Sequence, residues 1–455
     1  MAPVTKLMAL PAEMLTAIAE QVDDPHDLLA LRLVCKEVSA AAFEAFTTAF
    51  FTKRSHIYSC HGLQTLVDIS AQPHLVKKLQ EVELVCVRLN KERYQPHHTR
   101  IRYLVPPMTV PSGQEIPKVE QKGADVRQAW DEESERVREK GKDCFTHVFS
   151  NLSRLGVAPA VTLTLDVDET ASCFGFGSLQ RMLGPLVEEN DFQEGPHEEL
   201  VTAVLSSIVT TAYPVQQLAL CKGARNAGLN ETSFNLGHNT VARAAAPFAH
   251  LRSLALWVDA DDFEPVNTET AEDIARLFGS ATALEKLTVT STQAEGYATA
   301  NWYPALEQLA RGFATNALKN VDLRCPATIL RGYTDFLEVF KHTIKSLTLI
   351  DAMVDEDECW STMFLWLVEN VELEHLRLQG LQKDGGAVLL NEGKPVDCVF
   401  EGAAAVREGL TELARAPEYE DVEDEEDEDG PFMNGEFGYQ GDAVLDIDDD
   451  DEIYD

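Results

Sequence analysis

A short apolar unit recurs along the chain and constrains its fold more than any other feature. The unit reads apolar-x-x-apolar-x-apolar and occurs eight times. Its central pairs are Val82/Leu84, Leu163/Leu165, Leu218/Leu220, Leu254/Leu256, Leu287/Val289, Val321/Leu323, Leu347/Leu349 and Leu376/Leu378. From Leu218 onward, successive units are 26 to 36 residues apart. Alternating apolar positions predict a short strand that buries one face, so the pattern predicts eight such strands.

Helical stretches precede most of these strands. They lie at 199–208, 271–278, 304–310, 335–340 and 362–368. Helix and short strand at a nearly fixed period are typical of proteins whose units stack to bury a shared core. The pattern resembles a leucine-rich repeat, which implies an α/β solenoid of parallel strands over residues 151–416. We expect an irregular arc, because the Asn that follows the strand in typical members is missing. A doubly wound α/β sheet is the alternative, but no Gly-rich phosphate loop follows any strand.

A second feature is the apolar run Asp27–Lys36, DLLALRLVCK, which only Arg32 interrupts. Read as one helix, this run is apolar on every side and has to be buried on every side. The surrounding segment of roughly 40 residues is too small to bury that much surface alone. We therefore expect another protein to cover part of the helix.

The motifs around this run follow a recognisable order. Leu10-Pro11-x-Glu13 is followed by an amphipathic turn, by Asp-Leu-x-x-Leu and by Val-Cys-Lys. This order resembles the F-box, a three-helix adaptor-binding module, in the form found in filamentous fungi. It departs from the family pattern at Val38, where many members carry Trp, and at Ala19, where Leu is usual. The resemblance places these residues at the adaptor contact: Leu10, Pro11, Ile18, Leu28, Leu31, Val34 and Cys35. An ordinary N-terminal helical hairpin is the alternative.

These patterns divide the chain into five parts. We assign residues 1–50 to the F-box, 51–87 to a connecting helix and the first repeat strand, 88–150 to an insertion, 151–416 to the repeat domain and 417–455 to a tail. Prolines break the insertion, so we expect it to be a partly disordered loop with a charged helix near 119–142. The stretch 88–103 is basic and contains His97 and His98, which suits either a solvated loop or a docking patch for an acidic or phosphorylated ligand.

The C-terminal tail is strongly acidic. Residues 418–455 contain 19 Asp and Glu and no Lys or Arg, which is half of the net charge of −38. Like-charge repulsion predicts a disordered tail. An acidic chain also lacks the basic footprint that nucleic-acid binding requires. We expect neither a signal peptide nor a membrane span, because no apolar run reaches the length that a membrane helix needs.

Residues that could perform chemistry are scattered. The nine cysteines occur singly, without C-x-x-C, which favours reduced thiols in the cytoplasm or nucleus. His56, Cys60 and His61 lack the spacing of a zinc site. We expect no catalytic residue, no metal and no cofactor.

Binding residues are instead expected on the sheet. Residues between the buried positions of each strand should point away from the helices. The candidates for substrate contact are Trp257, Lys286, Arg324, His375 and Arg377. Trp and Arg are enriched at interface hot spots, and the set is cationic, so an acidic or phosphorylated target would suit it. A merely solvated sheet is the alternative.

The resemblance implies a substrate-recognition subunit of a Skp-cullin-F-box (SCF) ubiquitin ligase. Its partners would be a Skp-type adaptor, through it a cullin–RING ligase, and a protein substrate that the sequence does not identify. The alternatives are an F-box or repeat scaffold without ligase activity and an enzyme with a polar pocket.

Overall fold

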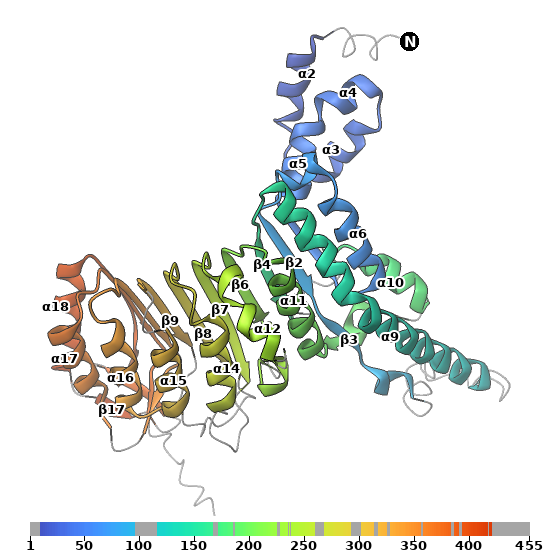
Figure 1. Ribbon diagram of the computed structural model, residues 1–455. Coiled ribbons are helices and arrows are strands. Elements are labelled where there is room, and N and C mark those ends of the chain that lie inside the picture. Colours follow the sequence, from blue (N-terminus) through green and yellow to red (C-terminus); the bar gives the residue numbers. More distant parts are fainter. Residues whose placement is uncertain are drawn as a thin grey trace, which may run out of the picture.

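The computed structural model is a mixed α/β protein with one large, mostly parallel sheet (Figure 1). A unit of short helices lies at its N-terminal end, and the sheet occupies most of the remaining chain. The structure describes residues 10–95, 116–166, 172–184, 187–224, 228–234, 236, 238–259, 268–292, 302–313, 317–324, 328–355, 358–383, 386–390, 394–416 and 418–420. Across these residues, none of the helices combines the length and the apolar character needed to cross a membrane.

Ten strands of the main sheet pair side by side in chain order. They are β1 (Lys53–Ile57), β2 (Glu81–Val85), β4 (Ala160–Thr164), β6 (Gln217–Lys222), β7 (Ser253–Asp259), β8 (Lys286–Thr292), β9 (Asn320–Arg324), β10 (Ser346–Ile350), β12 (His375–Gln379) and β16 (Asp397–Glu401). All pairings are parallel except the last, between β12 and β16. The strand order of a doubly wound sheet reverses at a switch point. The doubly wound alternative is therefore wrong.

All eight strands predicted from the repeated unit are confirmed. Their apolar residues align across the sheet, as Leu254 pairs with Leu287 and Val321 pairs with Leu347. These side chains are buried in one core that continues along the sheet. Strand β1 was not predicted, because its sequence Lys-Arg-Ser-His-Ile lacks alternating apolar residues.

Helices pack along one face of the sheet (Figure 1). They are α6 (Cys60–Ser70), α9 (Ile116–Leu155), α11 (His197–Thr211), α14 (Thr268–Phe278), α15 (Tyr303–Phe313), α16 (Leu330–Phe340), α17 (Trp360–Asn370) and α18 (Ala403–Leu413). The five predicted repeat helices are confirmed within this set. Contacts link α6 to α9, α9 to α11, and each helix from α14 to α18 to the next. Shorter elements are α7 (Pro73–Val76), β3 (Val87–Leu89), η1 (Lys91–Tyr94), α10 (Phe176–Leu183), η3 (Glu189–Asp191), β5 (Phe192–Glu194), η4 (Glu231–Phe234), α12 (His238–Arg243) and α13 (Ala245–Phe248).

The charged helix expected near 119–142 is confirmed, but it is longer than expected, and its description as part of a solvated insertion is wrong. Residues 116–150 belong to α9, a helix of 40 residues that contacts both α6 and α11. The second half of α9 buries Phe145, Val148 and Leu152 in the main core. The helix is therefore the connection between β2 and β4, although its surface is highly charged. Residues 96–115, with His97 and His98, lie outside the described residues.

The N-terminal unit consists of α2 (Ala12–Ala19), α3 (Pro25–Arg32), α4 (Lys36–Ala41) and α5 (Phe43–Phe51). The expected single helix across residues 27–36 is wrong, because α3 ends at Arg32 and α4 begins at Lys36. Helices α2, α3 and α4 each contact α5. One residue, Thr52, separates α5 from β1, so the unit is joined directly to the sheet.

A smaller sheet lies near the C-terminal end of the main sheet. It contains β11 (Met353–Val354), β13 (Gln382–Lys383), β14 (Gly386–Leu390), β15 (Lys394–Pro395) and β17 (Glu418–Glu420). Strand β17 pairs antiparallel with β14. The expectation of a disordered tail from residue 417 is therefore wrong for 418–420, and residues 421–455 lie outside the described residues.

Candidate functional site

Exposed apolar side chains gather on the N-terminal unit. Ten large apolar residues are exposed in the part of the chain that the structure describes, and half of them fall within one stretch of 21 residues. These are Met14, Ile18, Leu29, Leu33 and Val34. Scattered exposed apolar residues are normal, so the concentration of five on one small unit makes this unit a candidate site.

The turn between α3 and α4 carries the most exposed members. Leu33 is 80% exposed and Val34 is 57% exposed. The amide of Leu33 donates to the carbonyl of Ala30, and the amide of Val34 donates to that of Leu31. Cys35 then adopts an extended conformation and begins α4. The backbone is therefore fixed by hydrogen bonds, while both apolar side chains point into solvent.

The residues predicted at the adaptor contact divide into three groups. Pro11, Ile18 and Val34 are exposed, whereas Leu10, Leu31 and Cys35 are half-buried. Leu28 is only 3% exposed, so its side chain is not available for direct contact in this conformation, and its adaptor contact stays a prediction. Helix α3 packs on α4 and α5, and Leu28 lies on the side of α3 that this packing buries.

Three exposed apolar residues of the unit, Met14, Leu29 and Leu33, were not predicted. Met14 is four residues before Ile18 on α2, and Leu29 on α3 is four residues before Leu33, which follows the end of that helix. Residues at this spacing share one helix face. The i, i+4 pattern was available in the sequence, but it could not show which apolar face the other helices would cover.

The open face of the main sheet, which points away from the helices, carries the predicted substrate residues. Trp257, Thr290 and Arg324 pair in register across β7, β8 and β9. Lys286 and His375 are exposed at the first positions of β8 and β12, and Arg377 is exposed further along β12. Trp257 and Arg324 therefore lie on either side of β8, and His375 and Arg377 are neighbours on the same face of β12, but the two pairs and Lys286 do not form one cluster.

The expected cationic character of this set is wrong in part. Arg324 donates from Nε and Nη2 to the two carboxylate oxygens of Asp322, at 3.0 and 2.8 Å. Arg377 donates to the amide oxygen of Gln379 at 2.6 Å. The positive charge of Arg324 is balanced by its own neighbour, so the sheet surface there is polar rather than strongly basic.

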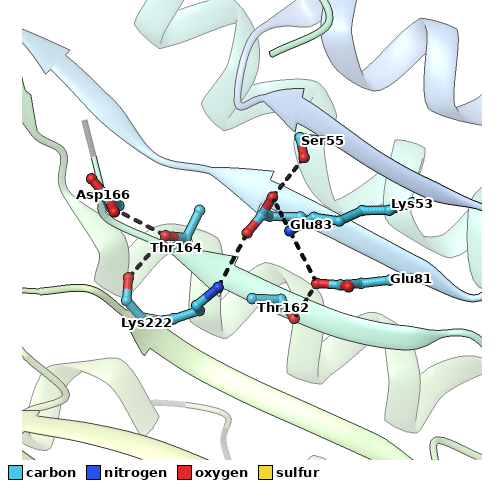
Figure 2. A network of polar contacts seen from close by, with 8 residues as sticks. All are labelled: Lys53, Ser55, Glu81, Glu83, Thr162, Thr164, Asp166 and Lys222. Atoms are coloured by element: carbon cyan, nitrogen blue, oxygen red, sulfur yellow. Dashed lines mark hydrogen bonds and ion pairs between the residues drawn. The ribbon is translucent and has the colours of Figure 1, made fainter. Parts of the chain in front are cut away.

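The first strands of the same face carry a polar network that was not predicted (Figure 2). Its residues come from β1, β2, β4 and β6 and the turn after β4: Lys53, Ser55, Glu81, Glu83, Thr162, Thr164, Asp166 and Lys222. Glu83 is the centre of the network, and its side chain is only 3% exposed. It accepts from Ser55 Oγ at 2.6 Å and lies 3.1 Å from Lys53 Nζ and 3.8 Å from Lys222 Nζ.

The network decides the charge of Glu83. Burial by itself raises the pKa of this carboxyl. The hydrogen bonds from Ser55 and Lys53 and the charges of Lys53 and Lys222 together outweigh burial and hold the pKa below its usual value of 4.5. Glu83 is therefore ionised at neutral pH and joins strands that are distant in sequence.

Replacing Glu83 with glutamine is expected to lower the free energy of unfolding by about 1–3 kcal/mol at pH 7, because a buried charged partner of two lysines is lost. A depressed folded-state pKa stabilises the fold above the unfolded-state pKa, and that contribution is lost as pH falls. The difference between wild type and Glu83→Gln should therefore shrink below about pH 4.5. Urea unfolding at several pH values measures this difference in the free energy of unfolding. The control is Glu81→Gln, which should have a smaller effect because the side chain of Glu81 is more exposed than that of Glu83. A constant difference at all pH values would contradict this role.

No cluster able to hold a metal ion is found among the residues that the structure describes. His56 is fully buried, and burial together with the charge of Arg54 lowers its pKa to about 3, so the ring is neutral. Burial and nearby Glu133 raise the pKa of Cys60 to about 11. A neutral imidazole and a protonated thiol at these positions are typical of packing residues.

Comparison with known proteins assigns no relative: no protein-family model matches this chain, and no curated protein matches its sequence. The candidate sites of the described residues are the exposed apolar side chains of the N-terminal unit and the polar open face of the sheet.

Proposed function

We propose that this chain is a substrate-recognition subunit of an SCF ubiquitin ligase. In this proposal, α2–α5 form an F-box that binds a Skp-type adaptor, and the α/β arc is an irregular leucine-rich-repeat-like solenoid that binds a protein substrate. The chain itself catalyses no reaction, and it acts in the cytoplasm or nucleus.

The observation that carries the proposal is the exposure of Leu33 and Val34 on a unit that exposes three further large apolar side chains. Burial of a Leu or Val side chain contributes roughly 1.5–3 kcal/mol, before the costs of association. Five such side chains on one small unit would supply enough burial for a stable complex. The motif order Leu-Pro-x-Glu, Asp-Leu-x-x-Leu and Val-Cys-Lys resembles that of the F-box, and this resemblance supports a Skp-type adaptor as the partner.

The geometry of the chain suits this role. Since only Thr52 separates α5 from β1, an adaptor bound to the unit would be held at a fixed orientation to the sheet. A substrate on the open face near Trp257 and Arg324 would then be kept at high effective concentration near the ligase. No bond-making residue is required of the chain for this function.

Reconstitution tests the proposal. Co-expressed with a Skp-type adaptor, the chain is expected to elute as a stable one-to-one complex, which then binds a cullin–RING pair. Light scattering after size-exclusion chromatography measures both steps. A complex that forms with the adaptor but excludes the cullin would favour a scaffold without ligase activity. Failure to bind the adaptor at all would reject the F-box assignment.

A further inference from the structure

A groove of about 690 Å³ lies beside the α3–α4 turn. Its lining includes the apolar side chains of Leu33 and Phe43 and the basic side chains of Arg32 and Lys36. None of the described residues that line it is acidic. The groove thus combines apolar surface with positive charge on a chain whose net charge is −38.

The only two basic residues of the N-terminal unit both line this groove. Residues 10–52 contain seven Asp and Glu but only two Lys and Arg, and both of these, Arg32 and Lys36, line this one groove. Neither forms an ion pair with any residue whose position is described. Bases in an acidic helical unit would ordinarily pair with neighbouring carboxylates. Here both charges remain available to a ligand.

Arg32 is held in place by aromatic rings. Its Cζ lies 3.9 Å from the ring centroid of Phe46 and 5.5 Å from that of Phe43. Stacking on aromatic faces fixes a guanidinium group while leaving its edge free to donate hydrogen bonds. A guanidinium oriented in advance loses less entropy when it binds a carboxylate.

Lys36 occupies a position that helix stability does not favour. It is the first residue of α4, where the helix dipole disfavours positive charge and favours Asp or Glu. It is also exposed, so it contributes no packing to the unit. Its charge therefore has no structural benefit in the isolated chain.

We propose that this groove is an acid-recognition subsite, which binds a partner segment that carries a carboxylate next to a large apolar side chain. Arg32 and Lys36 bind the carboxylate, and Leu33 and Phe43 contact the apolar side chain. The inference rests on the proposed function, because the partner segment then belongs to the Skp-type adaptor. The exposed apolar residues alone would not require a charged partner, whereas this groove requires a carboxylate on the adaptor.

The test compares Lys36→Glu with Lys122→Glu in the full-length chain, with a purified Skp-type adaptor as the probe. Both variants have the same net charge, and Lys122 is an exposed residue of α9 far along the chain from the groove. At low ionic strength, Lys36→Glu is expected to raise the Kd about tenfold relative to Lys122→Glu. In about 1 M salt, this difference should nearly disappear. Misfolding cannot explain the result, since glutamate suits the first turn of a helix.

Other outcomes overturn the inference in distinguishable ways. Equal Kd values for the two variants would show that only net charge matters. If the difference vanishes when residues 421–455 are removed, the groove binds the chain's own acidic tail rather than the adaptor. If wild type fails to bind the adaptor at any salt concentration, the proposed function fails and the inference falls with it.

Discussion

Replacing Leu33 and Val34 together with aspartate is expected to abolish adaptor binding and leave the fold unchanged. Both side chains are exposed in the isolated chain, so polar replacements there should change the free energy of unfolding by less than about 0.5 kcal/mol. In the complex the same positions would be buried. Loss of two apolar contacts of roughly 1.5–3 kcal/mol each, with two charges left to desolvate, predicts a rise in Kd of more than about 100-fold.

The matched control is the pair Val339→Asp and Leu365→Asp. These residues are also exposed, at 43% and 49%, but they lie on α16 and α17, which pack on the main sheet. Isothermal titration calorimetry with the adaptor and thermal unfolding of the free chain provide the two measurements. If the control weakens adaptor binding as strongly, the α3–α4 turn is not the contact. If the turn variant binds like wild type, the F-box assignment is wrong.

The burial of Leu28 determines which variants can test adaptor binding. The sequence placed Leu28 with Val34 on one continuous helix, so a charge at either position would test the same contact. The structure buries Leu28 among α3, α4 and α5 and exposes Val34 on the turn. A charge at Leu28 would unfold the unit and would lose adaptor binding for that reason alone. Exposed positions such as Leu33 and Val34 separate binding from folding, whereas Leu28 does not.

Most of the sheet could be predicted from the sequence, because one physical rule generates it. Each unit must bury an apolar row against a helix, and the buried row leaves a regular pattern of Leu and Val. That rule does not apply to β1, an edge strand whose outer side is closed by a bridge to Phe174. Its buried His56 and polar neighbours have no strand-like period, so the strand could not be recognised.

The candidate sites could be predicted only in part. The apolar composition of residues 27–36 indicated an interaction surface, but which residues are exposed depends on how α2–α5 pack. The Glu83 network brings together strands from residues 53 to 222, and no local pattern links residues so far apart. Tertiary contacts of this kind leave no periodic signal in a single sequence.

The helical conformation of α9 was predicted over 119–142, but its packing against the core was not. Its high content of charged residues suggested a solvated insertion. Yet its buried residues Val126, Glu133 and Val137 recur at helical spacing and continue into Phe145 and Val148. The narrow buried stripe was present in the sequence, but the charged residues around it obscured it. A helix with one buried stripe and a charged exterior is the expected outer element of an α/β arc.

Replacing Phe145 with alanine is therefore expected to lower the free energy of unfolding by about 3–5 kcal/mol. Phe145 is fully buried, and its ring stacks against Tyr58 and Phe149 with centroids 6.2 and 6.5 Å apart. Its loss would leave a cavity where α9 meets the first strands of the sheet. Lys140→Ala, at an exposed position of the same helix, is the control and should cost less than about 0.5 kcal/mol.

Urea unfolding of both variants, followed by circular dichroism, distinguishes an integral α9 from a solvated insertion. A solvated insertion would tolerate alanine at both positions, and the two variants would then unfold like wild type. A large loss confined to Phe145→Ala would mean that α9 supports the junction between the N-terminal unit and the arc. Since adaptor and substrate would bind on opposite sides of that junction, Phe145→Ala should also loosen the fixed orientation on which the proposed receptor function depends.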